Sequence, residues 1–247
     1  MSNQVFPSIG ALLRDNPYPG RGIIIGKSAD GQNAVSAYFI MGRSANSQNR
    51  IFAEKEGVLY TEPFDSAKVE DPSLIIYPAQ RKFQNKLILT NGDHTNTVLE
   101  GLKEGKSFQA SLESRCFEPD APHFTPRISG VLTFSEDDFS YEMSILKSAD
   151  PAGQGCNRFT FSYAALPGVG HFLHTYAGDG FPLPSFQGEP EGLAIPSGID
   201  DFTEQVWQAL NEKNRISLYV RYTHLRTGRE ENRLINKNKG DGQHEGI

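Results

Sequence analysis

Short apolar runs separated by turn-forming residues are the main pattern along this chain. Gly22–Gly26 and Ala34–Met41 are rich in β-branched and aromatic side chains, and Ala29-Asp30-Gly31 lies between them. Such a sequence is typical of a β-hairpin. The same criteria predict further strands from Arg50 onward and at Ser73–Tyr77, Lys86–Thr90, Ile128–Phe134, Phe139–Leu146, Arg158–Ala165 and Ile216–Leu225. The pattern therefore indicates a protein built largely of strands.

Three segments have a helical pattern instead. Ile9–Arg14 predicts one short helix. In Thr97–Phe117, apolar residues recur at roughly helical spacing, and Thr95 or Asn96 can serve as the N-cap. Asp200–Asn211 is the clearest amphipathic helix, with acidic residues in its first turn. We therefore expect an α+β protein with two substantial helices.

The rest of the chain divides into loops and a tail. Residues 166–200 are rich in Gly and Pro, which favour loops, although aromatic residues are interspersed. Residues 236–247 are polar and predict a disordered tail. The sequence contains no internal repeat and no linker that separates two cores. We therefore predict a single domain over residues 1–235, followed by the tail.

Composition narrows the class of protein. Of the 247 residues, 37% are hydrophobic, which is enough for a core. No run approaches the roughly 20 apolar residues of a membrane helix. The N-terminus has no signal-peptide pattern, and two cysteines, Cys116 and Cys156, are too few for a disulfide framework. We therefore expect a soluble cytoplasmic protein without a membrane partner, and we interpret Cys116 as a buried thiol.

Charge is unevenly distributed along the chain. The formal net charge of −6 argues against nucleic acid as the main partner, because binding to the phosphate backbone requires a basic face. Between residues 18 and 50, however, Arg21, Lys27, Arg43 and Arg50 are opposed by Asp30 alone. A second basic stretch covers residues 213–239. A small anion could bind such a stretch, but ordinary scatter of surface charge is the simpler explanation from charge alone.

The motifs of common cofactor sites are missing from the sequence. His171 and His174 are the only closely spaced histidines, and neither the cysteines nor an HExxH pattern completes a zinc site. A P-loop, a dinucleotide-binding GxGxxG motif and a Gly-x-Ser-x-Gly motif are also missing. We therefore expect neither a metal nor a cofactor.

Polar residues gather instead at the predicted strand ends. Arg21 begins the first strand, Arg43 and Arg50 bracket a loop rich in Ser and Asn, and Asn91–Thr95 follows a later strand. Guanidinium groups and free helix N–H groups suit a phosphate or a polar heterocycle. Glu118-Pro119-Asp120 adds two carboxylates in a rigid turn. Taken singly, each of these elements is explained as well by surface ion pairs or common turns.

Taken in order, four motifs resemble one family. They are Tyr18-Pro19-Gly20-Arg21-Gly22-Ile23, Gly42-Arg43-Ser44 with Asn49-Arg50, Asn91-Gly92-Asp93-His94-Thr95-Asn96-Thr97, and Thr125-Pro126-Arg127-Ile128. The series is similar to the archaeal-type IMP cyclohydrolases over roughly residues 18–165. This resemblance implies a four-layer αββα sandwich of antiparallel sheets, similar to the N-terminal-nucleophile hydrolase fold but without a self-processing nucleophile. The Gly/Pro-rich and C-terminal segments lie beyond the part that we align.

The resemblance also implies a reaction. These enzymes close the purine ring of the formamido-imidazole-carboxamide ribotide FAICAR with loss of water, which gives IMP, and they need no metal or cofactor. An enzyme for this reaction must hold the substrate in a reactive conformation and move protons. The implied partner is therefore a small purine ribonucleotide, and the resemblance further implies a homo-oligomer.

Site residues follow from the same resemblance. The implied phosphate anchors are Arg21, Arg43, Arg50 and Arg127. The implied catalytic residues are Glu118 or Asp120 for proton transfer, Arg50, and Tyr77, Lys82 or an arginine as hydrogen-bond donor to the formyl oxygen. The residues expected to shape the substrate pocket are Ser44, Asn91, Asp93, His94 and Thr95.

Two other functions stay open from the sequence. A non-catalytic purine-nucleotide-binding protein would keep the phosphate-binding arginines and lack turnover. An amide-bond hydrolase of the broader αββα class would need an N-terminal nucleophile, for which this chain offers only Ser2. The presence of Glu118, Tyr77 and Arg50 favours the cyclohydrolase over the non-catalytic binding protein.

Overall fold

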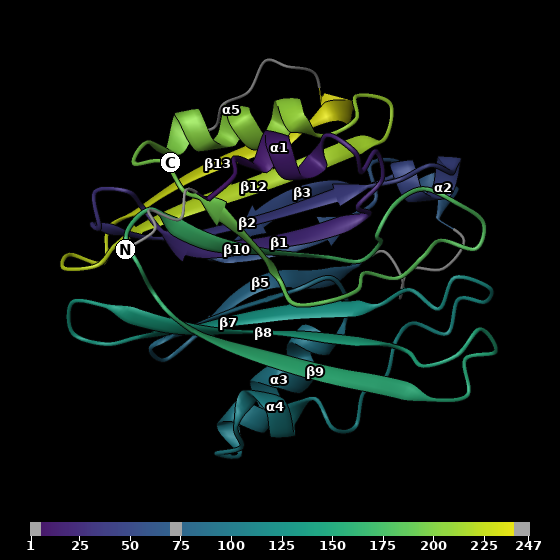
Figure 1. Ribbon diagram of the computed structural model, residues 1–247, viewed down its shortest axis with the longest axis horizontal. Coiled ribbons are helices and arrows are strands. Elements are labelled where there is room, and N and C mark those ends of the chain that lie inside the picture. Colours follow the sequence, from purple (N-terminus) through teal and green to yellow (C-terminus); the bar gives the residue numbers. More distant parts are fainter. Residues whose placement is uncertain (1–5, 70–75, 240–247) are drawn as a thin grey trace.

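Two antiparallel β-sheets form the centre of the molecule (Figure 1). A computed structural model describes residues 6–69 and 76–239. The six-stranded sheet has the strand order β11-β10-β1-β2-β12-β13. The strands of the seven-stranded sheet lie in sequence order, β3-β4-β5-β6-β7-β8-β9. The strands of the first sheet are β1 Arg21–Lys27, β2 Asn33–Met41, β10 Val169–His174, β11 Glu191–Ala194, β12 Arg215–His224 and β13 Glu230–Asn236. Those of the second are β3 Ile51–Lys55, β4 Val58–Glu62, β5 Tyr77–Phe83, β6 Lys86–Thr90, β7 Arg127–Phe134, β8 Phe139–Ser148 and β9 Cys156–Ala164.

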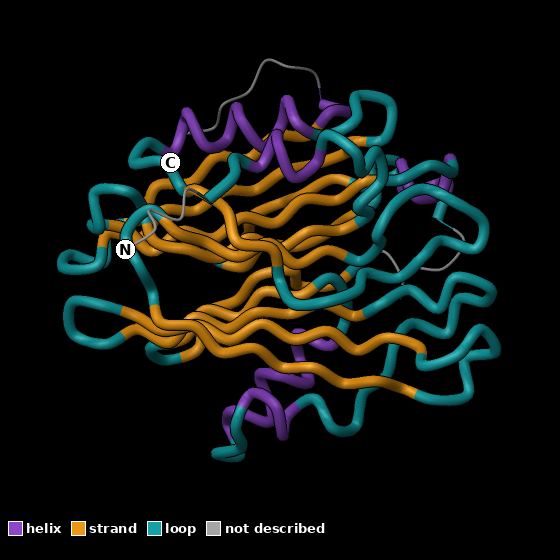
Figure 2. The backbone as a smooth tube through the Cα atoms, viewed as in Figure 1, coloured by secondary structure: helices purple, strands orange, loops and turns teal. Residues whose placement is uncertain are grey.

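Helices cover the outer face of each sheet, which gives the layer order αββα (Figures 1 and 2). Two helices pack on the six-stranded sheet, α1 Ile9–Leu13 and α5 Ile199–Ala209, and two pack on the seven-stranded sheet, α3 His94–Lys103 and α4 Phe108–Ser111. Three short elements lie at the periphery: α2 Ala45–Gln48 and the 3₁₀ turns Ser66–Lys68 and Lys237–Lys239. The structure therefore confirms an α+β protein with two antiparallel sheets.

Alternation along β1 explains how one strand contributes to two apolar layers. Ile23 and Ile25 pack between the two sheets, whereas Ile24 packs under α1 and α5. All seven residues of β1 are buried, because this strand lies inside a sheet that is covered on both faces. The apolar run at Gly22–Gly26 is thus a fully buried strand, and the predicted hairpin with β2 is confirmed.

The Gly/Pro-rich stretch contains two strands that the sequence prediction of loops missed. β10 pairs with β1 and β11 pairs with β10. Gly26 lies opposite Gly170 in this pairing, and a Cβ atom at Gly26 would lie 2.6 Å from the Gly170 Cα atom. Glycine therefore allows a close approach between neighbouring strands here, and it does not mark a loop.

The helix predicted over Thr97–Phe117 is wrong in its extent. Helix α3 begins at His94 and ends at Lys103, and α4 is a separate short helix. Gly105 adopts a positive φ of 78°, which ends the first helix, and Ser107 caps the second. The N-cap residue of α3 is Asp93, not Thr95 or Asn96.

Most other predicted elements are confirmed with small shifts in their bounds, including the short N-terminal helix, the β7–β8 hairpin, β6, β9, α5 and β12. Part of the predicted strand Ser73–Tyr77 lies outside the described residues. Asn236, predicted to begin the tail, instead ends β13 and exchanges side-chain hydrogen bonds with the backbone of Phe52 at 2.8 and 2.9 Å. Residues 240–247 and Ser2 lie outside the described ranges. Among the helices of these ranges, none is long and apolar enough to cross a membrane.

Candidate active site

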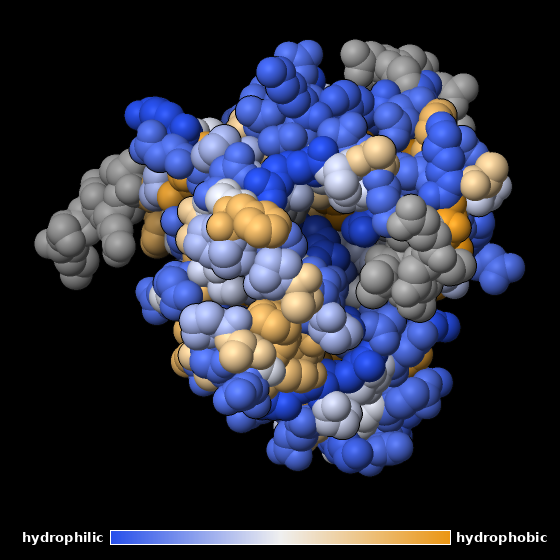
Figure 3. Space-filling view, turned by 90° about the vertical axis from the view of Figure 1, so that its right-hand side faces the viewer, coloured by the Kyte–Doolittle hydropathy of each residue, from blue (hydrophilic) through white to orange (hydrophobic). Residues whose placement is uncertain are grey.

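The predicted site residues gather at one end of the sandwich. β1 begins at Arg21, β5 at Tyr77 and β7 at Arg127, and Asn91 directly follows β6. Because neighbouring strands are antiparallel, these starts and ends meet at the same edge of the two sheets. Figure 3 shows this end of the molecule hollowed, with hydrophilic residues at the bottom of the hollow.

A buried ion pair lies at the centre of this group. Arg21 Nη2 lies 3.2 Å from Glu118 Oε2, and the two side chains are only 10% and 12% exposed. Arg21 Nη1 donates a second hydrogen bond to the Asn91 carbonyl oxygen, at 3.2 Å. Burial opposes the charge of Arg21, but the Glu118 carboxylate raises the pKa of the guanidinium well above its usual value. The Arg21 guanidinium therefore keeps its charge beside Glu118.

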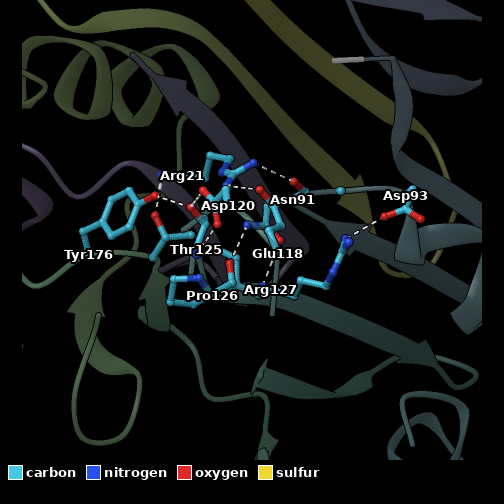
Figure 4. Close-up of polar contacts among 12 residues, drawn as sticks. Arg21, Asn91, Asp93, Glu118, Asp120, Thr125, Pro126, Arg127 and Tyr176 are labelled. Atoms are coloured by element: carbon cyan, nitrogen blue, oxygen red, sulfur yellow. Dashed lines mark hydrogen bonds and ion pairs between the residues drawn. The ribbon is translucent and has the colours of Figure 1, made fainter. Parts of the chain in front are cut away.

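Asp120 belongs to a chain of hydrogen bonds beside this ion pair (Figure 4). Its carboxylate accepts from the backbone N–H of Thr125 at 2.7 Å and also from the Thr125 hydroxyl. The Thr125 hydroxyl in turn contacts the Tyr176 hydroxyl at 2.6 Å. Burial raises the pKa of Tyr176 to about 12, so this phenol is neutral at physiological pH. The turn at Asp120 is thus connected to the end of β10.

Asn91 braces the two strands that carry the site. Its side-chain amide donates to the Pro126 carbonyl and its side-chain oxygen accepts from the Ile128 N–H, both at 2.9 Å. Its backbone carbonyl accepts from Arg21. The Asn91 side chain therefore holds the start of β7 against the end of β6, and the Asn91 backbone carbonyl helps to position Arg21.

Tyr77 lies fully inside the site. Its hydroxyl is 2.9 Å from that of Tyr38, and either oxygen can be the donor. Burial, and then the neighbouring Tyr77, raise the pKa of Tyr38 well above its usual value. If Tyr38 donates to Tyr77, the Tyr77 hydroxyl hydrogen is left for a ligand oxygen.

Three of the predicted phosphate anchors surround Tyr18. Burial raises the pKa of the Tyr18 hydroxyl, and three guanidinium charges oppose this rise, those of Arg21, Arg43 and Arg50. The Arg43 guanidinium lies 4.9 Å from the centre of the Tyr18 ring. The structure therefore brings together the three arginines that are separated by up to 29 positions in the sequence.

These arginines differ in their partners. Arg43 forms an ion pair with Asp179, with side-chain exposures of 33% and 51%, and also donates to the Gly180 carbonyl at 3.2 Å. Arg50 has no hydrogen-bonding or ion-pairing partner within residues 6–69 and 76–239, and its Nε atom is buried. Since buried guanidinium nitrogens are normally paired, the half-buried Arg50, whose Nε atom is buried without a partner, is the group best prepared to meet an anion.

Arg127 belongs to a second polar cluster, on the face of β7 that packs against α3. Arg127 Nη1 lies 2.6 Å from Asp93 Oδ1 and 3.3 Å from His94 Nδ1, and Arg115 pairs with the same Asp93. The Nε2 atom of His94 lies 3.2 Å from the Ile128 carbonyl oxygen. Burial, and then the charge of Arg127, lower the pKa of His94 to about 3, so the imidazole is neutral at physiological pH.

Three predicted residues have internal or peripheral partners. Thr95 is fully buried, and its hydroxyl contacts Thr90 and the carbonyl oxygens of Pro78 and Gly92. Ser44 is exposed and caps the short helix α2. Lys82 pairs with Glu230 at 2.5 Å, toward the end of β5 that is distant from Tyr77.

Sequence reasoning missed several residues of the site. Tyr18, Tyr38, Thr125 and Tyr176 all contact the predicted residues. Tyr18 and Thr125 lie in two of the four motifs, but their residue types alone indicate no role in the site. Tyr176 lies in the Gly/Pro-rich stretch, where an isolated aromatic residue gave no local sign of its partner 51 positions away.

Metal-ligating side chains do not cluster in the described ranges. No group of three or more His, Cys, Asp or Glu side chains that could hold a metal ion occurs there. Cys116 and Cys156 are both free thiols of intermediate exposure, so the interpretation of Cys116 as a buried thiol is wrong.

Comparison with known proteins gives consistent matches. A model of the family described as IMP cyclohydrolase-like protein matches residues 18–228, which includes the Gly/Pro-rich stretch and β12. The IMP cyclohydrolase of Methanopyrus kandleri is 30% identical over 115 residues, which are 45% of this chain and 57% of that protein. The IMP cyclohydrolase of Methanothrix thermoacetophila is 28% identical over 120 residues, which are 47% and 58%. The chain thus spans a little over half the length of these curated relatives.

Proposed function

This chain belongs to the IMP cyclohydrolase-like protein family, and on that premise we propose that it closes the purine ring of FAICAR to give IMP. The observation that carries the proposal is the set of arginines around Tyr18. Two of their charges are balanced, because Arg21 pairs with Glu118 and Arg43 with Asp179. The unpaired charge of Arg50 supports binding of an anion such as the 5′-phosphate of a ribonucleotide.

The reaction needs few chemical groups. The carboxamide nitrogen of the substrate attacks the neighbouring formyl carbon, the nitrogen loses a proton, and the formyl oxygen gains one. The resulting carbinolamine then loses its hydroxyl group as water, and the second proton of that water comes from the former formamide nitrogen. A rigid site that holds the two substituents in contact supplies much of the rate enhancement, and a proton acceptor and donor supply the rest.

The site contains groups for each of these steps. Either Glu118 or Asp120 can accept the proton of the attacking nitrogen for transfer to the formyl oxygen, and can then carry the proton of the former formamide nitrogen to the departing hydroxyl group. The hydroxyl of Tyr77, when Tyr38 donates to it, can donate to the formyl oxygen as negative charge develops there. Neither role requires a covalent intermediate.

Turnover of synthetic FAICAR tests the proposal directly. Purified full-length protein should convert FAICAR to IMP without added metal, ATP or folate, and the change in absorbance follows the reaction. A protein that binds IMP but does not turn FAICAR over would instead be a non-catalytic nucleotide-binding protein. A protein that neither binds IMP nor converts FAICAR would contradict the proposal altogether.

Three broader expectations accompany the proposal. The αββα layer order supports the predicted likeness to the N-terminal-nucleophile hydrolase fold. Homo-oligomeric assembly and a cytoplasmic location stay predictions. Sedimentation of the purified protein would test the first of these two, and fractionation of cells would test the second.

A further inference from the structure

The loop that follows β10 lies at the same end of the molecule as the candidate active site. We call residues 177–184 the site loop. β10 runs antiparallel to β1, and its last residue, His174, lies opposite Gly22 near the start of β1. The chain therefore leaves β10 beside Arg21, at the end that is hollowed in Figure 3.

The base of the site loop is held by hydrogen bonds. The Ala177 N–H donates to the Pro184 carbonyl oxygen at 2.9 Å, and the Phe186 N–H donates to the Thr175 carbonyl oxygen at 3.0 Å. The ammonium group of Lys147, on β8, donates to the Phe186 carbonyl oxygen at 2.7 Å. These bonds join the two arms of the loop to each other and to the seven-stranded sheet.

One side of the site loop contacts the arginines. The Arg43 guanidinium forms an ion pair with Asp179 and donates to the Gly180 carbonyl oxygen at 3.2 Å. Together with Arg50, Arg43 belongs to the guanidinium charges around Tyr18. This side of the loop therefore lies next to the groups proposed to bind the phosphate.

The other side of the site loop contacts the turn that carries the two carboxylates. His123 belongs to this turn, and its N–H donates to the Asp120 carbonyl oxygen at 3.0 Å. His123 Nδ1 accepts a hydrogen bond from the Leu183 N–H at 3.1 Å. The Phe181 ring meets the His123 ring edge-on, with 5.4 Å between ring centres. This side of the loop therefore lies next to the groups proposed to move protons.

Phe181 presents an aromatic ring to solvent at this position. It is 81% exposed, more than any other large hydrophobic residue in the described part of the chain. A single exposed apolar residue indicates nothing by itself. Here, however, the backbone is held on both sides of the ring, at Gly180 by Arg43 and at Leu183 by His123. A ring that is held in place before binding loses little freedom when a ligand covers it.

A purine ribonucleotide has parts that match both sides of the site loop. Its 5′-phosphate suits the arginines, whereas its flat heterocycle must lie near the proton-transferring groups during ring closure. Flat heterocycles stack well on aromatic side chains. Phe181 lies on the side of the loop that contacts the carboxylate turn, which is the side expected for the heterocycle.

We propose that Phe181 stacks on the heterocycle of the bound purine ribonucleotide and that the site loop holds the ring in position for this contact. This inference rests on the proposed function for the identity of the nucleotide. The contact removes the exposed apolar surface of Phe181 from water, which stabilises the complex. It assigns a binding role to part of the Gly/Pro-rich stretch.

Calorimetry of the full-length protein with two ligands tests the inference without turnover. IMP contains both the phosphate and the heterocycle, whereas ribose 5-phosphate lacks the heterocycle. Phe181→Ala should weaken IMP binding by about tenfold to 50-fold and change ribose 5-phosphate binding by less than about twofold. Phe181→Tyr, which keeps an aromatic ring, should recover most of the IMP affinity. Leu166→Ala is the matched control, because Leu166 is 57% exposed and lies before β10, at the far end of that strand.

Fluorescence provides a second readout. Trp207 is the single tryptophan of the chain and is buried under α5. Phe181→Trp introduces an indole on the site loop, and IMP should quench its emission, whereas ribose 5-phosphate should leave the emission unchanged. The natural protein titrated with IMP corrects for the emission of Trp207.

The outcomes separate the inference from the proposed function. Equal losses of affinity for IMP and ribose 5-phosphate in Phe181→Ala would overturn the inference, as would unchanged IMP affinity or unquenched emission of Phe181→Trp. A protein that binds IMP through Phe181 but does not convert FAICAR would contradict the proposed function alone. A natural protein that does not bind IMP would contradict both. In an active enzyme, Phe181→Ala should raise KM for FAICAR by about tenfold and change kcat by less than about threefold.

Discussion

Two polar clusters meet at Gly92, on opposite faces of the same sheet edge. The inner cluster is formed by Arg21, Glu118, Asp120, Thr125 and Tyr176, and the outer cluster by Asp93, His94, Arg115 and Arg127. Tyr176 and Asp93 lie at opposite sides of the group in Figure 4. A Cβ atom at Gly92 would lie 2.7 Å from Arg127 Nη1 and 3.5 Å from Glu118 Oε1, so glycine allows both clusters to approach.

The clusters use similar residues for different purposes. In the outer cluster both arginines pair with Asp93. The neutral His94 contacts the Arg127 side chain through Nδ1 and the Ile128 carbonyl oxygen through Nε2. Most of the polar groups of this cluster bind one another, although Arg115 Nε is buried without a partner, and they join α3 to the sheet. The inner cluster lies beside Tyr77 and the unpaired Arg50, where a ligand can take part. An arginine–carboxylate pair on the α3 face of the sheet thus stabilises the packing of a helix, whereas a pair on the inner face can contact a ligand.

Replacing one carboxylate in each cluster should give the largest contrast. We expect Glu118→Gln to lower kcat by about 100-fold with little change in KM, because Arg21 loses the charge that balances it. Asp93→Asn, the matched change in the outer cluster, should keep kcat within about threefold and lower the free energy of unfolding. FAICAR kinetics and urea unfolding of both variants measure this. Equal losses of kcat would show that the clusters do not differ in function.

Removing the unpaired arginine should affect binding more than chemistry. Arg50→Ala should raise KM for FAICAR by about tenfold to 50-fold and also lower kcat, because a charge-assisted contact with phosphate is lost. Arg81→Ala is the control, since Arg81 is a partly exposed arginine on β5 that contacts Asn96 at 3.4 Å. Calorimetry with IMP provides a second readout. Unchanged IMP affinity in Arg50→Ala would contradict its role as an anchor.

The outer cluster should set part of the pH dependence of stability. The pKa of His94 is about 3 in the folded protein and near 6.5 when unfolded, so the unfolded chain binds the proton first as pH falls. The contribution of the neutral His94 to the free energy of unfolding is therefore complete above pH 6.5. Below pH 6.5 it falls by about 1.4 kcal/mol per pH unit at most, until pH approaches 3. His171, with a pKa lowered by burial to about 4, adds a similar contribution.

Urea unfolding between pH 8 and 4.5 measures this effect. His94→Gln should show a shallower loss of unfolding free energy with falling pH, whereas His224→Gln, a change in the β12–β13 turn, should keep the slope of the natural protein. A slope in His94→Gln equal to that of the natural protein would show that His94 is not the group responsible.

The smallest expected effect lies at the rim of the inner cluster. Asp179→Asn weakens the partly exposed ion pair of Arg43, so more of this charge becomes available to the substrate. We expect KM for FAICAR to fall by about twofold to fivefold, with kcat unchanged. Glu62→Gln, which breaks the exposed pair with Lys55, is the control. A rise in KM in Asp179→Asn would show instead that Asp179 holds Arg43 in its binding position.

The local pattern of apolar and turn-forming residues was sufficient to predict most of the strands. The β1–β2 and β7–β8 hairpins follow from apolar runs on either side of turn residues, and they form as predicted. The strand β10 was missed because the glycine at position 170, which breaks the local strand pattern, serves a close contact with Gly26 of β1. That contact joins residues 144 positions apart, so no window of sequence contains it.

For the site, the sequence by itself determined which chemical groups are present and their order in four motifs. Only the tertiary structure decided how they are used. Asp93, His94 and Arg127 turn to the α3 face and bind one another, whereas Arg21 and Glu118 pair in the interior. Strand alternation and the antiparallel order of the sheets set these directions. Glu118 and Asp120 also differ in their surroundings. Glu118 is buried and paired with Arg21, whereas Asp120 is partly exposed and bonds to Thr125, and the stability of each charge depends on such neighbours, some of them distant in the chain.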